Sequence, residues 1–186
     1  MKSVLLNLDK DTEKLRVSME HLATFGIVPE RIPGILDEDP ERGFSLAMIE
    51  AIKAIRDEER SVIFEDDILL KSWDIPQLPE GFDMVYLGAN LKGPTERINE
   101  RLVKITAAWT THAVIYSRQG AEKVLSQYKV EYGVYDNWLK EHFHKDNNCY
   151  LVTPMIAYQR PGYSEIKDVE VDYTEVMNIN YNTYAS

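Results

Sequence analysis

Residues 62–70 read Val-Ile-Phe-Glu-Asp-Asp-Ile-Leu-Leu, so three consecutive carboxylates interrupt an otherwise apolar run. Such a run is typical of a buried strand that delivers acidic side chains to the carboxyl edge of an α/β sheet, where ligands bind. Neighbouring carboxylates repel each other by roughly 1 kcal/mol in water and several-fold more at a lower effective dielectric. A divalent cation held by oxygen ligands removes the repulsion and commonly brings phosphate oxygens with it. Glu65, Asp66 and Asp67 therefore predict either a metal-bound nucleoside-diphosphate site or an acidic turn that faces solvent.

Length and composition indicate one globular domain. The chain has 186 residues, of which 44% are hydrophobic, and this is enough for a sizeable core. It contains no apolar run of about eighteen residues, so no membrane span is expected, and its first apolar stretch is too short for a signal peptide. The single cysteine, Cys149, excludes an internal disulfide and a cysteine-based zinc site. A reducing, cytoplasmic location fits these features.

The formal net charge of −10 argues against a large surface for nucleic acids, because nonspecific affinity for them comes mainly from lysine and arginine. A small basic patch is compatible with this charge. A nucleic acid is therefore not expected as a partner, although it stays open as an acceptor. The acidic segments at 37–41 and 165–175 are expected to be solvated surface.

Hydrophobic periodicity and turn residues give the order of the elements. Strands are predicted at 3–8, 31–36, 61–64, 82–87, 102–107, 112–117 and 149–152, and helices at 12–25, 44–55, 119–128 and 136–144. This order predicts a single-domain, Rossmann-like α/β fold whose mixed sheet is flanked by helices and is parallel at first. Residues 91–101 are expected to form a mobile loop, and the polar residues 167–186 a C-terminal tail or arm.

The chain lacks the two common backbone devices for binding phosphate. It has no glycine fingerprint and no P-loop, because Gly88, Gly93 and Gly120 are isolated. If a nucleotide binds, a cation such as Mn²⁺ or Mg²⁺ must therefore neutralise its diphosphate. A cation has this role in metal-dependent glycosyl transfer, where it bridges the diphosphate and stabilises charge on the departing nucleotide.

Further segments share an order and a spacing along the chain. They are residues 4–9 (Val-Leu-Leu-Asn-Leu-Asp) with Lys14, 30–35 (Glu-Arg-Ile-Pro-Gly-Ile), 61–67 (Ser-Val-Ile-Phe-Glu-Asp-Asp), 82–88 (Phe-Asp-Met-Val-Tyr-Leu-Gly), 111–117 (Thr-His-Ala-Val-Ile-Tyr-Ser), 120–125 (Gly-Ala-Glu-Lys-Val-Leu), 134–136 (Val-Tyr-Asp), and Pro154, Gln159 and 163–166 (Tyr-Ser-Glu-Ile). This series resembles glycosyltransferase family 25, which includes lipopolysaccharide glycosyltransferases and collagen galactosyltransferases. The resemblance depends on the order of the segments, because no single motif is specific.

The sequence departs from the family in two ways. Many members have a Ser-His pair at the start of the helix before the acidic strand, whereas residues 43–48 here read Gly-Phe-Ser-Leu-Ala-Met. The role of that histidine cannot be transferred to this chain. The chain is also short, so its elaborations on the acceptor side are expected to be small.

The resemblance implies a GT-A fold over residues 1–166 and an inverting, metal-dependent transfer of a hexose from a UDP-sugar to a hydroxyl acceptor. The acceptor could be a glycan, a lipopolysaccharide, a protein or a modified base. Asp67 would be the metal ligand, with Glu65 as a second candidate, although Glu65 or Asp66 could instead lie near the ribose or a bound water. The other donor-binding candidates are Asn7, Leu8, Asp9, Lys14 and Gln159.

Several candidates keep an ordinary structural explanation beside the functional one. Asp136 is the candidate general base, but an aspartate at this position could equally cap a helix. Lys14 could approach the diphosphate or be an exposed helix lysine, and His144 is considered as a third metal ligand. Trp109 and Trp138 could stack on sugar rings or fill the core.

A late loop that contains Gln159, Tyr163 and Ser164 could close over the donor and exclude water. The alternative function is a catalytically degenerate GT-A-like module that binds a sugar or nucleotide without turnover. The missing histidine and the small size keep that alternative open. A phosphoesterase or nucleotidyl-transfer enzyme would need a second cluster of carboxylates or histidines, and the sequence supplies no obvious one.

Overall fold

The computed structural model describes residues 1–164 and 167–185. Within these ranges the centre is an eight-stranded sheet in the order β2-β1-β3-β10-β5-β11-β8-β7. Its strands are β1 (Lys2–Asn7), β2 (Glu30–Pro33), β3 (Arg60–Glu65), β5 (Met84–Tyr86), β7 (Thr95–Asn99), β8 (Leu102–Ile105), β10 (Ala113–Ser117) and β11 (Cys149–Val152). Smaller pairs are formed by β4 (Ile68–Leu70) with β12 (Ala157–Gln159), β6 (Asn90–Leu91) with β9 (Ala108–Trp109), and β13 (Gly162–Ser164) with β14 (Val169–Val171).

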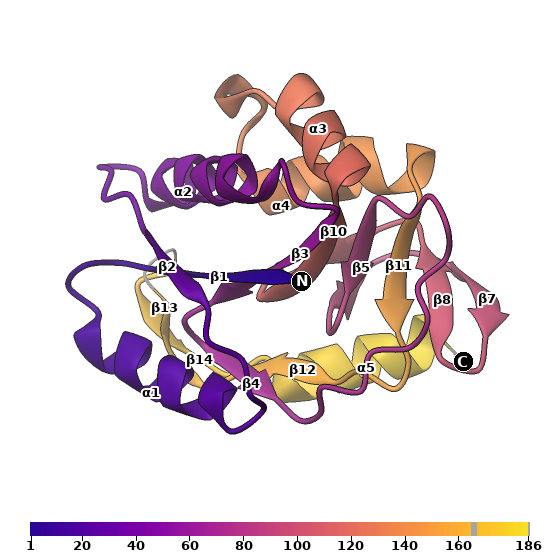
Figure 1. The fold of residues 1–186 in the computed structure, drawn as a ribbon, viewed down its shortest axis with the longest axis horizontal. Helices are drawn as coiled ribbons and strands as arrows, with labels where there is room; N and C mark the ends of the chain where they lie inside the picture. Colours follow the sequence, from indigo (N-terminus) through magenta and orange to yellow (C-terminus); the bar gives the residue numbers. More distant parts are fainter. Residues whose placement is uncertain (165–166, 186) are drawn as a thin grey trace.

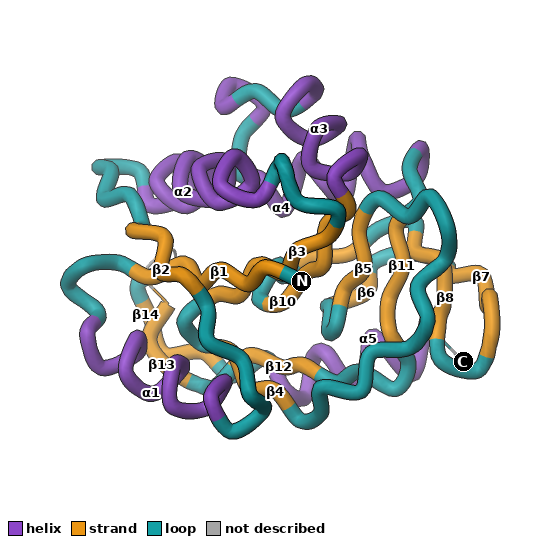
Figure 2. The backbone as a smooth tube through the Cα atoms, in the orientation of Figure 1, coloured by secondary structure: helices purple, strands orange, loops and turns teal. Residues whose placement is uncertain are grey.

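Helices cover both faces of the sheet (Figure 1). One face carries α2 (Pro40–Ile55), α3 (Arg118–Gln127) and α4 (Tyr135–Trp138), and the other carries α1 (Thr12–Ala23) and α5 (Thr174–Tyr184). Figure 2 shows the strands as the layer between these helices, with β4 and β12 on the α1 side. None of the helices in the described ranges combines the length and the apolar character that crossing a bilayer requires.

The pairing of the strands follows from their connections. The strand β1 pairs in parallel with β2 and β3, because α1 and α2 return the chain to the same edge. The sheet then becomes mixed, since β10 is antiparallel to β3 and β5, and β11 is parallel to β5 but antiparallel to β8. The predicted fold class, an α/β mixed sheet flanked by helices, is confirmed.

Two apolar layers fix the carboxyl ends of the first strands. Met48 and Ile52 of α2 are fully buried on one face, and Leu22 of α1 is fully buried on the other. Because β1 and β3 are covered on both faces, their sequences are continuous apolar runs rather than alternating patterns. The last residues of these strands, Asn7 and Glu65, therefore lie at one edge of a rigid layer.

The prediction of a mobile loop at residues 91–101 is wrong. This segment contains β7, which pairs antiparallel with β8 and forms the edge of the sheet. The side chains of β7 are mostly exposed, so the segment is polar and lacks the apolar alternation of a half-buried strand. Backbone hydrogen bonds to β8 hold this segment as a strand, and such bonds cannot be predicted from the pattern of side chains.

In place of the tail expected at residues 167–186, the described residues form β14 and α5. Met177 is fully buried, and Tyr181 packs against the same cluster one helical turn later. At the C-terminal end of α5, the Thr95 hydroxyl donates to the carbonyl of Tyr184 (2.5 Å) and the Arg97 guanidinium donates to that of Ala185 (3.2 Å). These bonds satisfy carbonyls that a helix end leaves free. The domain boundary at residue 166 stays a prediction.

Candidate active site

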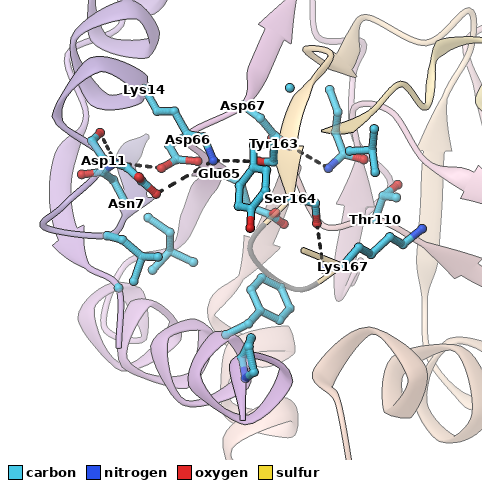
Figure 3. A pocket seen from close by; sticks show the side chains of 18 of the residues that line it. Asn7, Asp11, Lys14, Glu65, Asp66, Asp67, Thr110, Tyr163, Ser164 and Lys167 are labelled. Carbon is cyan, nitrogen blue, oxygen red and sulfur yellow. Dashed lines mark hydrogen bonds and ion pairs between the residues drawn. The ribbon is translucent and has the colours of Figure 1, made fainter. Parts of the chain in front are cut away.

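A pocket of about 1010 Å³ opens where β1 and β3 end. It is lined by residues of these strand ends, of α1, of the start of α2, of the Trp109–Thr110 turn and of the segment from Gln159 to Ser164. Figure 3 shows the acidic side chains gathered in it, with Asn7 and Lys14 on one side of Asp67 and Thr110 on the other. Ligands of open α/β sheets bind at such carboxyl ends of parallel strands.

The three acids that end β3 are held by neutral partners from three different elements. The Asn7 amide donates to Asp66 Oδ2 (2.7 Å), the Gln159 amide to Asp67 Oδ2 (2.9 Å) and the Thr111 hydroxyl to Glu65 Oε1 (2.8 Å). All three acids line the pocket. The three acids are half-buried, and the Asp66–Asp67 turn faces this pocket rather than open solvent.

Burial and mutual repulsion raise the pKa values of the carboxyl groups in this cluster. Burial, followed by the negative charges of Asp67 and Asp136, raises the pKa of Glu65 well above its ordinary value. Burial and then the charge of Asp66 raise the pKa of Asp67 to about 6. The positive charges of Lys14 and Arg160 act in the opposite direction on Asp67 but are smaller effects.

Asp136 belongs to the same cluster and does not cap a helix. The segment expected as one helix at 136–144 consists of α4, a π-helical turn (Leu139–Phe143) and a 3-10 turn (His144–Asp146). Val134 occupies the N-cap position of α4 without a side-chain hydrogen bond. The Asp136 carboxylate instead accepts from the backbone N–H of Thr110 (2.9 Å) and lies 3.0 Å from the Thr111 hydroxyl. The N-cap explanation is therefore wrong.

The Thr111 hydroxyl joins two of the carboxyl groups. Its oxygen lies 2.8 Å from Glu65 Oε1 and 3.0 Å from Asp136 Oδ1. A hydroxyl donates only one hydrogen bond, so both contacts are hydrogen bonds only when one of the two carboxyl groups is protonated and donates to the threonine oxygen. The raised pKa of both Glu65 and Asp136 favours such a protonated form, with the proton on one of the two carboxyl groups.

The turn that carries these threonines is strained. Thr110 has a φ of 72°, in the left-handed region that a β-branched residue rarely adopts. Such a conformation costs about 1–3 kcal/mol and persists only where surrounding contacts impose it. Here the contacts are the hydrogen bond from Thr110 to Asp136 and the one from the Asn90 N–H to the Thr110 hydroxyl (3.2 Å).

Two cationic side chains lie beside the acids. Lys14 lies 3.9 Å from the Asp11 carboxylate and donates to the carbonyl of Tyr163 (2.9 Å), so it is a pocket residue rather than an ordinary exposed helix lysine. Arg160 donates through Nη2 to the Ser18 hydroxyl and the Asp66 carbonyl, both at 2.6 Å. Sequence reasoning missed Arg160 and Asp11, although Arg160 directly follows the predicted Gln159.

The remaining predicted residues fall into two groups. Asn7, Leu8 and Gln159 line the pocket, as predicted from the strand end and the late segment. Asp9 does not line it: its side chain is 78% exposed and pairs with Arg31 (2.5 Å). Because β1 already ends at Asn7, the following turn carries Asp9 outward.

His144 is placed where it cannot bind a metal with the acids. Its Nδ1 accepts the N–H of Ala108 (3.3 Å), so its Nε2 carries the proton and donates to the Tyr86 hydroxyl (2.8 Å). Burial lowers the pKa of His144 to about 3. The two tryptophans have different environments. Trp138 is a buried core residue, whereas Trp109 lies at the rim of the pocket.

The donor set fits a cation shared with a ligand rather than a cage made by the protein alone. In residues 1–164 and 167–185, no group of three His, Cys, Asp or Glu side chains is arranged to hold a metal. Asp67 Oδ1 is nevertheless buried without a hydrogen-bond partner in the same ranges. Mg²⁺ and similar hard cations are usually bound by one or two carboxylates, several waters and substrate phosphates. Asp67 with Glu65 provides such a partial set.

The sequence matches no protein-family model and no curated protein. Its fold is similar to the crystal structure of A197 from STIV, with a TM-score of 0.54, 11% identity, and coverage of 92% of this chain and 93% of that chain. At this identity the similarity concerns the fold alone.

Weaker similarities include transferases. A Drosophila β-1,4-galactosyltransferase 7 mutant in complex with manganese, UDP-Gal and xylobiose has a TM-score of 0.45 and 10% identity, over 66% of this chain and 51% of that chain. This chain thus spans about half the length of that galactosyltransferase. A glycosyltransferase involved in the glycosylation of the major capsid of PBCV-1 has a TM-score of 0.48 and 8% identity, over 97% and 99% of the two chains. A cytidylyltransferase is also among the similar structures. The resemblance to family 25 stays a prediction.

Proposed function

We propose that this protein is a metal-dependent inverting glycosyltransferase that moves a hexose from a UDP-sugar to a hydroxyl acceptor. The observation that supports this most is the convergence of Glu65, Asp67 and Asp136 in one pocket, at the end of β3 and the start of α4. Three acids that repel each other in a buried site need a cation when they are ionised. A diphosphate donor supplies the remaining oxygen ligands of that cation.

In this proposal Asp67, with Glu65, holds Mn²⁺ or Mg²⁺, which when bound stabilises the negative charge that develops on the departing nucleotide. Lys14 and Arg160 lie close enough to the acids to lower the pKa of Asp67, so their charges also reach the space beside it. They bind the diphosphate oxygens through charge-assisted hydrogen bonds. Asn7 and Leu8, at the end of β1, contact the nucleoside.

Asp136 acts as the general base. Thr110 and Thr111 fix its carboxylate on the pocket side of α4, and each oxygen keeps a lone pair for the acceptor hydroxyl. Burial raises its pKa, which makes the carboxylate a stronger base than an exposed aspartate. Removal of the acceptor proton as the hydroxyl attacks the anomeric carbon opposite to the leaving UDP gives inversion of configuration.

The test is calorimetry of UDP binding with and without metal. We expect tight binding only with Mn²⁺ or Mg²⁺, and we expect Asp67→Ala to remove the dependence on metal. Asp57→Ala, which removes an exposed carboxylate remote from the pocket, is the matched control. Equal affinity for UDP with and without metal would contradict the proposal. A thermal-shift screen of nucleotide sugars with Mn²⁺ then identifies the base and the sugar.

The nature of the products separates glycosyl transfer from the other candidates. Transfer from a UDP-sugar releases UDP, whereas nucleotidyl transfer from UTP to a sugar phosphate releases pyrophosphate.

One observation favours a catalytically degenerate binding module: both oxygens of Asp136 already have hydrogen-bond partners. Binding of a UDP-sugar without release of UDP on a broad panel of acceptors would establish the binding module instead.

A further inference from the structure

Two lysines meet the indole of Trp109 at the rim of the pocket. Lys92 Nζ and Lys140 Nζ each lie 4.7 Å from the centroid of the Trp109 ring. The lysines come from the segment after β6 and from the π-helical turn after α4, so they are 48 positions apart in the sequence. The electron-rich face of a tryptophan attracts ammonium groups and holds them in place.

These lysines are not neutralised by strong ion pairs. Lys140 lies 3.2 Å from Glu141, but the Glu141 side chain is 56% exposed, and such pairs are screened by solvent. In the described part of the chain, no carboxylate forms an ion pair with Lys92. Burial, followed by the charge of Lys140, lowers the pKa of Lys92, in agreement with the position of both ammonium groups at one indole ring. Among the described residues, a single solvent-screened ion pair, between Lys140 and Glu141, thus offsets these two cations in a protein with a net charge of −10.

The same turn connects these cations to the candidate base. Trp109 precedes the strained Thr110, whose N–H donates to Asp136. Trp109 and Asn137 line the pocket. Thr110, which follows Trp109, and Lys14 lie on opposite sides of Asp67 (Figure 3). Lys92 and Lys140 are not among the residues that line the pocket, but both contact Trp109, which does line it and which precedes the residue that donates to Asp136. The two lysines therefore lie beside the Asp136 side of the pocket and apart from Lys14.

We propose that the acceptor carries an anionic group, a phosphate or a carboxylate, which Lys92 and Lys140 bind while a hydroxyl of the same sugar chain reaches Asp136. This inference rests on the proposed function, because it takes the Asp136 side of the pocket as the acceptor side. An anion bound by the lysines offsets their mutual repulsion and replaces their water with charge-assisted hydrogen bonds. The Trp109 ring contacts both ammonium groups, so it does not serve as a free stacking platform.

An acidic glycan fits this site better than a nucleic acid. Phosphate-tracking surfaces use many lysines and arginines along a groove, whereas this site has two lysines around one ring. The charge of −10 also repels a long polyanion.

The experiment uses the full chain and three monosaccharide probes: glucose 6-phosphate, glucuronic acid and glucose. Binding is followed by the ¹H–¹⁵N resonance of the Trp109 indole, which is assigned by its loss in Trp109→Phe. We expect at least one anionic sugar to bind about tenfold or more tightly than glucose, and the difference to shrink at high salt. The phosphate and carboxylate arms identify the anion. The double variant Lys92→Gln/Lys140→Gln should remove the preference, with a loss of roughly threefold to tenfold for each lysine.

The control variant is Lys71→Gln/Lys145→Gln, which changes net charge equally at two exposed lysines outside the pocket. Equal binding of all three sugars, or an equal loss in the control variant, would overturn the inference. Lysine-dependent binding of a short single-stranded oligonucleotide, with no preference among the sugars, would replace it with a nucleic-acid acceptor. Metal-dependent UDP binding is measured on the same samples: if it persists while the anion preference is absent, only this inference fails.

Discussion

Substituting Asp67 with asparagine should stabilise the metal-free protein while removing its proposed activity. The two side chains have the same shape, and the asparagine carbonyl can accept the hydrogen bond that Gln159 donates to Asp67 Oδ2 (2.9 Å). The substitution therefore removes mainly a negative charge that burial and Asp66 disfavour. A protein that keeps such a charge for binding gives up stability for function.

The magnitude follows from the pKa of Asp67, which burial and Asp66 raise from 3.8 to about 6. At about 1.4 kcal/mol per pKa unit, the ionised carboxylate costs at most about 3 kcal/mol, and screening at the pocket reduces this to about 1–3 kcal/mol. For a chain of this size, each kcal/mol shifts Tm by roughly 2–4 °C, so Asp67→Asn should raise Tm by roughly 2–12 °C at pH 7.5.

The pH dependence gives a sharper test. The folded protein keeps the Asp67 proton up to about pH 6, whereas the unfolded chain releases it near pH 3.8. The wild-type protein therefore loses stability as the pH rises from about 4 to about 6, and this loss is complete above pH 6. The advantage of Asp67→Asn should be full at pH 7.5 and should shrink as the pH falls through 6 towards 4.

The assay is thermal unfolding in EDTA at several pH values, followed by UDP calorimetry with Mn²⁺. Asp57→Asn is the control, because it also removes one carboxylate but from a side chain that is 92% exposed, and it should leave Tm almost unchanged. A lower Tm for Asp67→Asn at pH 7.5 would refute the electrostatic reasoning. Metal-dependent UDP binding that survives the substitution would refute the role proposed for Asp67.

Three further predictions test other parts of the structure. Asp136→Asn should lower kcat for transfer by about 10²–10⁴ while metal-dependent UDP affinity stays within twofold or so, as steady-state kinetics and calorimetry on one preparation would show. Arg160→Gln should weaken UDP binding about tenfold through loss of a charged hydrogen bond, and unchanged affinity would exclude Arg160 from the diphosphate site. Met177→Ala should destabilise the protein by about 2–5 kcal/mol in urea unfolding because Met177 is fully buried, whereas a change below about 0.5 kcal/mol would mean that α5 does not pack on the domain.

The elements around the acids could be predicted from sequence because their burial is continuous. β1 and β3 each contain an uninterrupted run of three apolar residues, and α2 places Met48 and Ile52 one helical turn apart. These patterns follow from packing on both faces of a parallel sheet. Asn7 and the acids of β3 then lie at one edge, since parallel neighbours end together.

Other elements and side-chain positions could not be predicted, because their sequences show no apolar pattern that indicates them. The edge strand β7 is polar because its side chains are exposed, and α5 buries mainly Met177 among polar residues. Asp9 follows β1 closely in sequence, yet a single turn carries it to the surface and into an ion pair with Arg31. The direction of the Asp9 side chain is therefore set by the turn after β1 and not by the strand.

The sequence by itself determined the α/β order, the buried strands and the delivery of Glu65, Asp66 and Asp67 to a sheet edge, because each depends on how residues within one segment are buried. Only the tertiary structure decided that Asp136 faces these acids across Thr111, 25 positions before it, and that Arg160 lies beside Asp66. It also decided that Lys92 and Lys140 converge on Trp109. Such contacts join segments that are distant along the chain, and they form only when packing of the layers brings those segments together.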